Sequence, residues 1–185
     1  MRAFIAIPLP QDCRRLLEKL QSSLRETGAE VRWTAVASIH LTLKFLGEMD
    51  PARLEPTAEA LLEACGSHKA FPLSLGGLGA FPGASNPRVV WCGVRGEIER
   101  LSRLQADVEH ACARLGFPRE ARPYHPHLTL GRVKGRRNLH SLTECITIGS
   151  NLESGFTADR CHLYRSSLTP RGAIYEVLKT VKLPA

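Results

Sequence analysis

The sequence predicts an α+β fold of two pseudo-symmetric lobes, each a mainly antiparallel sheet with helices on its outer face. Strands and amphipathic helices alternate along the 185 residues, and the tetrapeptide His-Leu-Thr-Leu occurs once in each half, at His40–Leu43 and His127–Leu130. An apolar content of 43% is enough for a packed core. We therefore expect residues 1–185 to form a single bilobal domain, with each motif on a strand near the centre of its sheet.

The first half of the chain is predicted to alternate strands with helices. Leucines at helical spacing that end before Gly28 predict the first helix. Gly47 and the Asp50-Pro51 pair end the motif strand, and the alanines and leucines that follow predict a second helix. The predicted elements are strands Ala3–Ile7, Val31–Trp33 and Ile39–Leu46 and helices Gln11–Thr27 and Ala52–Cys65.

The second half is predicted to be richer in strands. The segment Gly79–Pro87, rich in Gly, Pro, Ser and Asn, is expected to be a loop at the rim of the site. The apolar stripe of Glu97–Leu115 predicts a helix that ends at Gly116. The remaining predicted elements are strands Phe71–Leu78, Arg88–Val94, Phe156–Tyr164 and Ile174–Val181, a motif strand from Pro126 or His127 to Val133, a short helix Asn138–Cys145 and a turn at Thr169–Gly172.

Each motif can supply half of a catalytic site. Side chains two residues apart share a strand face, so His40, Thr42 and Lys44 are predicted on one side, and the leucines and Phe45 on the core side. The ordinary pKa of His is roughly 6.5, so one imidazole can accept a proton while another donates one. The threonine hydroxyls can hold phosphoryl oxygens where charge develops. Two such motifs predict acid–base chemistry on a phosphodiester.

Composition and motifs argue against several other classes of protein. The 25 basic and 18 acidic residues give a net charge of +7, which favours an anionic partner. Six scattered cysteines without a Cys-x-x-Cys pair indicate reduced thiols, so we expect neither disulfides nor a structural metal. No cofactor is expected either. Gly-x-Ser-x-Gly and Walker sequences are absent. The N-terminal apolar run is too short for a signal peptide or a membrane span, so a cytoplasmic protein without membrane contact is expected.

Further segments around the motifs form an ordered set over nearly the whole chain. They are Arg2–Ile7, Arg32-Trp33, HLTLKFLGE from His40, Pro87–Trp91, RPYHPHLTLGR from Arg122 and LYRSSLTPRGAIYEVL from Leu163. This set resembles the two-histidine phosphoesterase superfamily, in particular the RNA 2′,3′-cyclic phosphodiesterases, also called 2′-5′ RNA ligases. The resemblance implies an active-site cleft between the lobes and hydrolysis of RNA 2′,3′-cyclic phosphate ends to 2′-phosphomonoesters. It also implies reversible, ATP-independent 2′-5′ joining of RNA ends.

The resemblance also implies roles for individual residues. His40 corresponds to the proton donor and His127 to the proton acceptor, although the sequence itself treats the two motifs alike. Thr42 and Thr129 are the phosphate-binding candidates, together with Arg132. Arg132 lies at an odd offset from His127, which places it on the opposite strand face unless a bulge or the strand end at Gly131 turns it inward.

Three further residues are possible substrate contacts. Lys44 is either a cation on the motif face or a solvated strand lysine. Tyr124 is an aromatic residue that could stack on a nucleobase. His125 shares strand parity with His127 but lies before Pro126, at the strand edge.

Two other functions stay open from the sequence. A phosphodiesterase of a small cyclic or linear nucleotide would use the same pair of histidines. A noncatalytic RNA-end binding protein would keep the fold, although two intact motifs argue against it. The expected partner is RNA with a 2′,3′-cyclic phosphate end or a nucleotide, and the expected oligomeric state is a monomer.

Overall fold

Two antiparallel sheets organise the computed structural model, which describes residues 1–169 and 172–185. The four-stranded sheet has the order β3 (Leu41–Glu48), β1 (Arg2–Ile7), β8 (Arg160–Thr169), β9 (Gly172–Lys182). The five-stranded sheet has the order β2 (Val31–Trp33), β6 (His127–Val133), β5 (Val89–Gly96), β4 (Phe71–Phe81), β7 (Glu153–Ala158). Every neighbouring pair of strands is antiparallel, as the sequence predicted.

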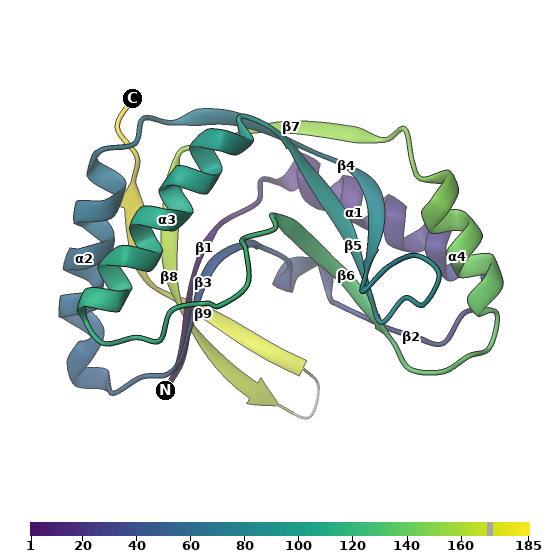
Figure 1. Cartoon of the computed structure of the whole chain (residues 1–185), viewed down its shortest axis with the longest axis horizontal. Coiled ribbons are helices and arrows are strands. Elements are labelled where there is room, and N and C mark those ends of the chain that lie inside the picture. Colours follow the sequence, from purple (N-terminus) through teal and green to yellow (C-terminus); the bar gives the residue numbers. More distant parts are fainter. Residues whose placement is uncertain (170–171) are drawn as a thin grey trace.

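Helices cover the outer side of each sheet. Helices α2 (Leu54–Gly66) and α3 (Ile98–Arg114) contact the four-stranded sheet and form the first lobe with it. Helices α1 (Gln11–Arg25) and α4 (Leu139–Ile148) contact the five-stranded sheet and form the second lobe. Short 3₁₀ turns occupy Val36–Ser38 and Pro51–Arg53. Figure 1 shows the two helix pairs at opposite ends with the sheets between them, so the predicted α+β fold of two lobes is confirmed.

The motif strands do not both lie near the centre of their sheets. Strand β3 is an edge strand, and β6 lies one strand in from the edge. Strand β1 takes the inner position because its residues from Ala3 to Ile7 are all buried, which suits a strand covered on both faces. The predicted central position is therefore wrong for the first motif.

Other predicted boundaries also change. The expected strand Phe156–Tyr164 is two strands, because Ala158 pairs with Phe71 in one sheet and Arg160 pairs with Lys182 in the other. Strand β4 includes residues 79–81 of the expected loop, and α4 runs three residues further than predicted. Pro170 and Arg171 of the predicted turn lie outside the described residues.

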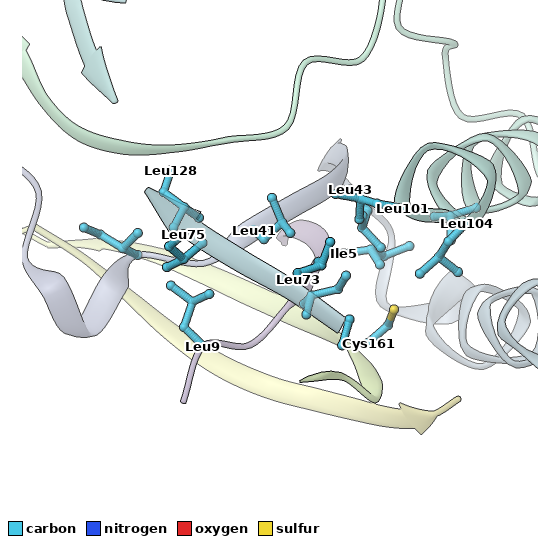
Figure 2. Close-up of a cluster of buried hydrophobic side chains, with 14 of the residues drawn as sticks. Ile5, Leu9, Leu41, Leu43, Leu73, Leu75, Leu101, Leu104, Leu128 and Cys161 are labelled. Carbon is cyan, nitrogen blue, oxygen red and sulfur yellow. The ribbon is translucent and has the colours of Figure 1, made fainter. Parts of the chain in front are cut away.

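One hydrophobic core joins the two lobes and contains the leucines of both motifs. Leu41 and Leu43 from β3 belong to the same buried cluster as Leu128 and Leu130 from β6. Figure 2 shows Leu41, Leu43 and Leu128 as members of this cluster, together with Ile5. Burial of each leucine is worth about 1.5–3 kcal/mol. The leucines therefore anchor both motif strands in a common core.

None of the helices within residues 1–169 and 172–185 combines the length and apolarity needed to cross a lipid bilayer.

Candidate functional site

A β-bulge lies at the last residue of the first motif. Thr42 pairs with Ala6 and Lys44 pairs with Ile5, so Leu43 has no opposite residue on β1. Such an extra residue places two neighbouring side chains on the same side and reverses the alternation beyond it. Leu43 and Lys44 accordingly both point into the protein.

The bulge corrects two predictions made from strand parity. Lys44 does not share the face of His40: its side chain is 4% exposed, and its Nζ donates to Glu109 Oε1 at 2.6 Å. Nζ also donates to the carbonyl of Pro118. Phe45, predicted on the core side, is 70% exposed. Strand alternation predicts the wrong face for Lys44 and for Phe45, because it assumes that every residue of β3 pairs with one residue of β1.

The second motif has a bulge at the same position, its last residue. Thr129 pairs with Trp91 and Gly131 pairs with Val90, which leaves Leu130 without an opposite residue. The exposed side chain of the next residue, Arg132, thereby returns to the face of the motif histidine.

The surroundings of Gly131 and Arg132 fit this geometry. A Cβ atom on Gly131 would lie 2.6 Å from Val31 Cγ1 and 3.0 Å from Trp33 Cε3, so the inward-turned position accepts only glycine without rearrangement. The positive charge of Arg132 lowers the pKa of His127, which places the guanidinium within electrostatic reach of that ring. The bulge that the sequence offered as one way to turn Arg132 toward the motif face is present, and the contact of Arg132 with phosphate stays a prediction.

His40 lies in an aromatic environment. Its ring stacks on Phe4 with the centroids 4.4 Å apart, and it meets Tyr175 edge-on at 5.1 Å. Burial lowers the pKa of His40 to about 4, a backbone hydrogen bond to Ser38 partly opposes this shift, and the charge of Arg14 adds to it. His40 is therefore a neutral imidazole at pH 7 in the free protein.

His127 has a defined tautomer. Its Nδ1 lies 2.6 Å from the carbonyl oxygen of His125, and because a carbonyl only accepts, Nδ1 carries the proton. Burial lowers the pKa of His127, and the charges of His125 and Arg132 lower it further. The neutral ring thus has an unprotonated Nε2, which can accept a proton.

Both motif histidines use the same local hydrogen bond. His40 bonds to the backbone of Ser38 and His127 to that of His125, in each case two residues earlier in the chain. The two half-sites therefore repeat in conformation as well as in sequence.

Contacts between the two motif strands bring the half-sites together. Strands β3 and β6 touch each other. The hydroxyl of Tyr124, three residues before His127, donates to the carbonyl of Thr42 at 3.1 Å. Burial raises the pKa of this tyrosine, so the hydroxyl stays a donor. Tyr124 is engaged in joining the lobes, and its predicted contact with substrate stays a prediction.

Aromatic rings surround His127 as well. Phe81 meets His127 edge-on at 4.9 Å, and Trp91 meets His125 edge-on at 5.4 Å. His125 is exposed, so it stays a candidate contact at this wall. The sequence offered one signal for Trp91, since an aromatic residue in the strand paired with a motif strand can share its face.

His162 lies close to the first half-site, although the sequence analysis did not identify it as a candidate residue. It pairs with Ala6 on the side of β1 opposite to Thr42, and its Nδ1 lies 3.0 Å from the Tyr164 hydroxyl. Burial lowers the pKa of His162. The only signal in the sequence was its spacing of two residues from Tyr164, which puts both on one strand face.

Within the described parts of the chain, no three side chains of the His, Cys, Asp or Glu type gather where a metal ion could bind. The described cysteines are all free thiols.

Comparisons with known proteins match this arrangement. A model of the 2′-5′ RNA ligase superfamily matches residues 8–169. The chain is 35% identical over 184 residues to an RNA 2′,3′-cyclic phosphodiesterase of Methanothermobacter thermautotrophicus, with 99% of each chain covered. It is 37% identical over 169 residues to one of Aeropyrum pernix, with 90% of this chain and 94% of the relative covered. The crystal structure of a Thermus thermophilus protein superposes with a TM-score of 0.84 at 27% identity, covering 99% and 98% of the two chains.

Proposed function

Because the chain belongs to the 2′-5′ RNA ligase superfamily, we propose that it hydrolyses RNA 2′,3′-cyclic phosphate ends to 2′-phosphomonoesters by acid–base catalysis with two histidines. The RNA 2′,3′-cyclic phosphodiesterases to which it is similar over nearly its whole length support this proposal. The observation that carries it is the pair of repeated half-sites on strands that touch each other.

His127 is proposed to act as the general base. Its Nε2 is unprotonated in the neutral ring, because Nδ1 donates to the His125 carbonyl. A water molecule at Nε2 would give up its proton to the ring while its oxygen attacks phosphorus. Burial and Arg132 lower the pKa of His127, so this base is available at neutral pH.

His40 is proposed to act as the general acid. Formation of the 2′-phosphomonoester requires the bond between phosphorus and the 3′ oxygen to break, and that oxygen takes a proton from His40. The pKa of about 4 leaves His40 neutral in the free protein. A phosphodiester anion bound beside the ring favours its charged form, so the pKa of the donor should rise when substrate binds.

Thr42, Thr129 and Arg132 are proposed to hold the phosphoryl group. Each Thr lies two residues after its His on the same strand face, so the two hydroxyls would approach the phosphate from opposite lobes. Arg132 would supply a charge-assisted hydrogen bond to the non-bridging oxygens, where negative charge grows in the transition state. These groups require no metal ion.

The same groups can catalyse joining of RNA ends. If the 5′-hydroxyl of a second RNA replaces the attacking water, deprotonation at His127 and protonation of the 3′ oxygen by His40 yield a 2′-5′ linkage. Every step is reversible and no ATP is consumed. We propose this as a second reaction of the same site.

Phosphorus NMR tests the proposal directly. An RNA oligomer with a 2′,3′-cyclic phosphate end is incubated with the protein in excess EDTA, and a 2′-phosphate product is expected. His40→Ala and His127→Ala should each lower turnover by about 100-fold or more. His140→Ala is the matched control, because His140 is 86% exposed on α4.

Other outcomes of this experiment distinguish the alternatives. A 3′-phosphate product, or unchanged turnover in either His variant, would contradict the mechanism. Hydrolysis of a 2′,3′-cyclic mononucleotide but not of the oligomer would indicate a small-nucleotide phosphodiesterase. Binding of the oligomer without reaction would indicate a noncatalytic RNA-end binding protein.

A further inference from the structure

A buried glutamine of α1 is bonded to the bulge of the second motif. Gln21 is only 5% exposed, and its Nε2 donates to the carbonyl of Leu130 at 2.9 Å and to that of Thr34 at 2.7 Å. Leu130 is the bulged residue, without an opposite residue on β5. An amide is costly to bury unless its hydrogen bonds are made, and the two hydrogens of this Nε2 are used on these two carbonyls. Helix α1 therefore holds the backbone of the motif itself.

The carbonyl of Leu130 accepts two hydrogen bonds. Besides Gln21, the backbone N–H of Thr34 donates to it at 2.9 Å. A carbonyl oxygen has two lone pairs, so these two bonds use its full capacity. Together they fix the plane of the peptide group that joins Leu130 to Gly131.

Glycine at position 131 makes this peptide group important for the residue beyond it. Gly131 can adopt more backbone conformations than a residue with a side chain, and the direction of Arg132 depends on the conformation it takes. A side chain at position 131 would collide with Val31 and Trp33, so none can restrict this freedom. Arg132 itself is exposed, so packing does not set its direction. The backbone at Leu130 has to set it.

The first half-site repeats the arrangement. Gln105 of α3 donates from Nε2 to the carbonyl of Leu43, the bulged residue of the first motif, at 3.3 Å. Each bulge thus receives a glutamine amide from a helix of its own lobe. The first bulge has a further anchor, because the next residue is Lys44 and its side chain is paired with Glu109. At the second bulge the next residue is glycine, so the glutamine has more to hold.

We propose that Gln21 is a positioning residue of the second half-site, which directs Arg132 to the face of His127 by holding the carbonyl of Leu130. This inference rests on the proposed function, in which Arg132 holds the phosphoryl group and His127 is the base. Gln21 is buried, so it acts through the backbone that it bonds and not on the substrate. Gln105 has the equivalent role at the first bulge.

Titration of His127 by NMR in the substrate-free protein tests the proposal without catalysis. The charges of His125 and Arg132 both lower the pKa of His127, and only Arg132 lies beyond the bulge. Gln21→Met keeps the length of the side chain but removes both donor hydrogens, so Arg132 should move away and the pKa of His127 should rise. Arg132→Gln should raise it too, and Gln21→Met should then add nothing further. The ring signals of His127 are identified by their absence from His127→Ala.

The same double-mutant cycle in kcat/KM connects Gln21 with activity. On an RNA 2′,3′-cyclic phosphate, Gln21→Met should lower kcat/KM by about 10-fold, the lower end of what a hydrogen bond to a charged group contributes. In the Arg132→Gln background the same substitution should lower it by less than about 2-fold, because the group that Gln21 positions is already gone. A glutamine that only stabilised the fold would have equal effects in the two backgrounds.

Two further variants control for general effects on the fold. Gln105→Met is the matched control, because it removes the equivalent hydrogen bond from the other bulge. It should leave the pKa of His127 unchanged. If Gln21→Met does not fold, Gln21→Asn takes its place: it keeps a buried amide but is one methylene shorter, and it should also raise the pKa of His127.

The outcomes separate this inference from the proposed function. An unchanged pKa of His127 in Gln21→Met or in Arg132→Gln, or equal effects of Gln21→Met in both backgrounds, would overturn the positioning role. If the pKa cycle gives the expected result but the wild type does not hydrolyse the RNA, the proposed function fails and the positioning of Arg132 stands. If the wild type hydrolyses the RNA and the effects of the two substitutions simply add, the proposed function stands and this inference fails.

Discussion

Acidification should destabilise the protein through His40. Burial lowers the pKa of His40 to about 4 in the folded state, whereas an unfolded chain has the ordinary value of roughly 6.5. Between these values the unfolded state binds more protons than the folded state. The contribution of the neutral, buried ring is therefore complete above pH 6.5 and is lost as the pH falls toward 4. Linkage gives a loss of about 2 kcal/mol between pH 7 and pH 5.

Urea unfolding at the two pH values measures this contribution. Trp33 and Trp91 report unfolding through their fluorescence, and the free energy of unfolding is compared for the wild type and His40→Gln. The loss of packing in the variant is present at both pH values, so it cancels in the difference, as do the contributions of His127 and His162. The variant should lose about 2 kcal/mol less than the wild type on acidification. Equal losses in the two proteins would refute the reasoning.

This titration also bears on catalysis. His40, the proposed proton donor, has a pKa of about 4 and so carries its proton in only a small fraction of free molecules at pH 7. The value of kcat/KM reports the free protein, so both limbs of its pH profile should lie below the ordinary pKa of histidine. A bound phosphate anion raises the pKa of the donor, so the profile of kcat should extend to higher pH.

Three further substitutions test groups around the site. Arg132→Gln should raise KM for a cyclic phosphate by about 10- to 100-fold. It should also move the limb of the kcat/KM profile that His127 controls to higher pH, because the guanidinium lowers the pKa of His127. If neither limb of the profile moves, Arg132 does not act on His127. Lys44→Met leaves the partly buried Glu109 without its ion pair and should lower the free energy of unfolding by about 3–5 kcal/mol. The double variant Lys44→Met with Glu109→Leu should recover most of this loss. A single variant as stable as the wild type would contradict this prediction. Tyr124→Phe removes one hydrogen bond between the lobes, so it should lower the free energy of urea unfolding by about 1 kcal/mol. It should also lower kcat more than it changes KM, because the two half-sites would be held less firmly. A change confined to KM would instead indicate that Tyr124 contacts the substrate.

The sequence predicted the elements well where periodicity was strong. The apolar stripe of Glu97–Leu115 became α3 within one residue at each end, and the second motif strand has the predicted end at Val133. The leucines of both motifs lie in the core as expected. These features depend on residues near in sequence, which a single chain displays directly.

The strand faces of Lys44, Phe45 and Arg132, which follow the motifs, could not be predicted from periodicity. A bulge depends on the neighbouring strand, and nothing within β3 alone shows that Leu43 lacks a partner on β1. The prediction from strand alternation therefore placed Lys44 and Phe45 on the wrong faces of the strand. For Arg132 the sequence held a clue, since glycine at position 131 is typical of a bulge, whereas the first motif has lysine at the corresponding position.

The division of Phe156–Tyr164 between two sheets could not be predicted either, because it too depends on which strands the segment pairs with. Both parts have the side-chain alternation of a strand, and the change of sheet occurs at the single residue Asp159. Periodicity reports which residues are extended. It does not report which neighbour an extended segment pairs with.

The crossing of the chain between lobes has a mechanical consequence. After β1 the chain leaves the first lobe to form α1 on the second, and it crosses again on the way to β3, β4, α3, β6 and β8. These crossings and the common core oppose a hinge motion of one lobe against the other. The relative position of the two motif strands is therefore set during folding. A site formed between them would be preorganised, so a substrate would not have to supply the free energy to assemble it. For the same reason, neither sequence half should fold when expressed by itself.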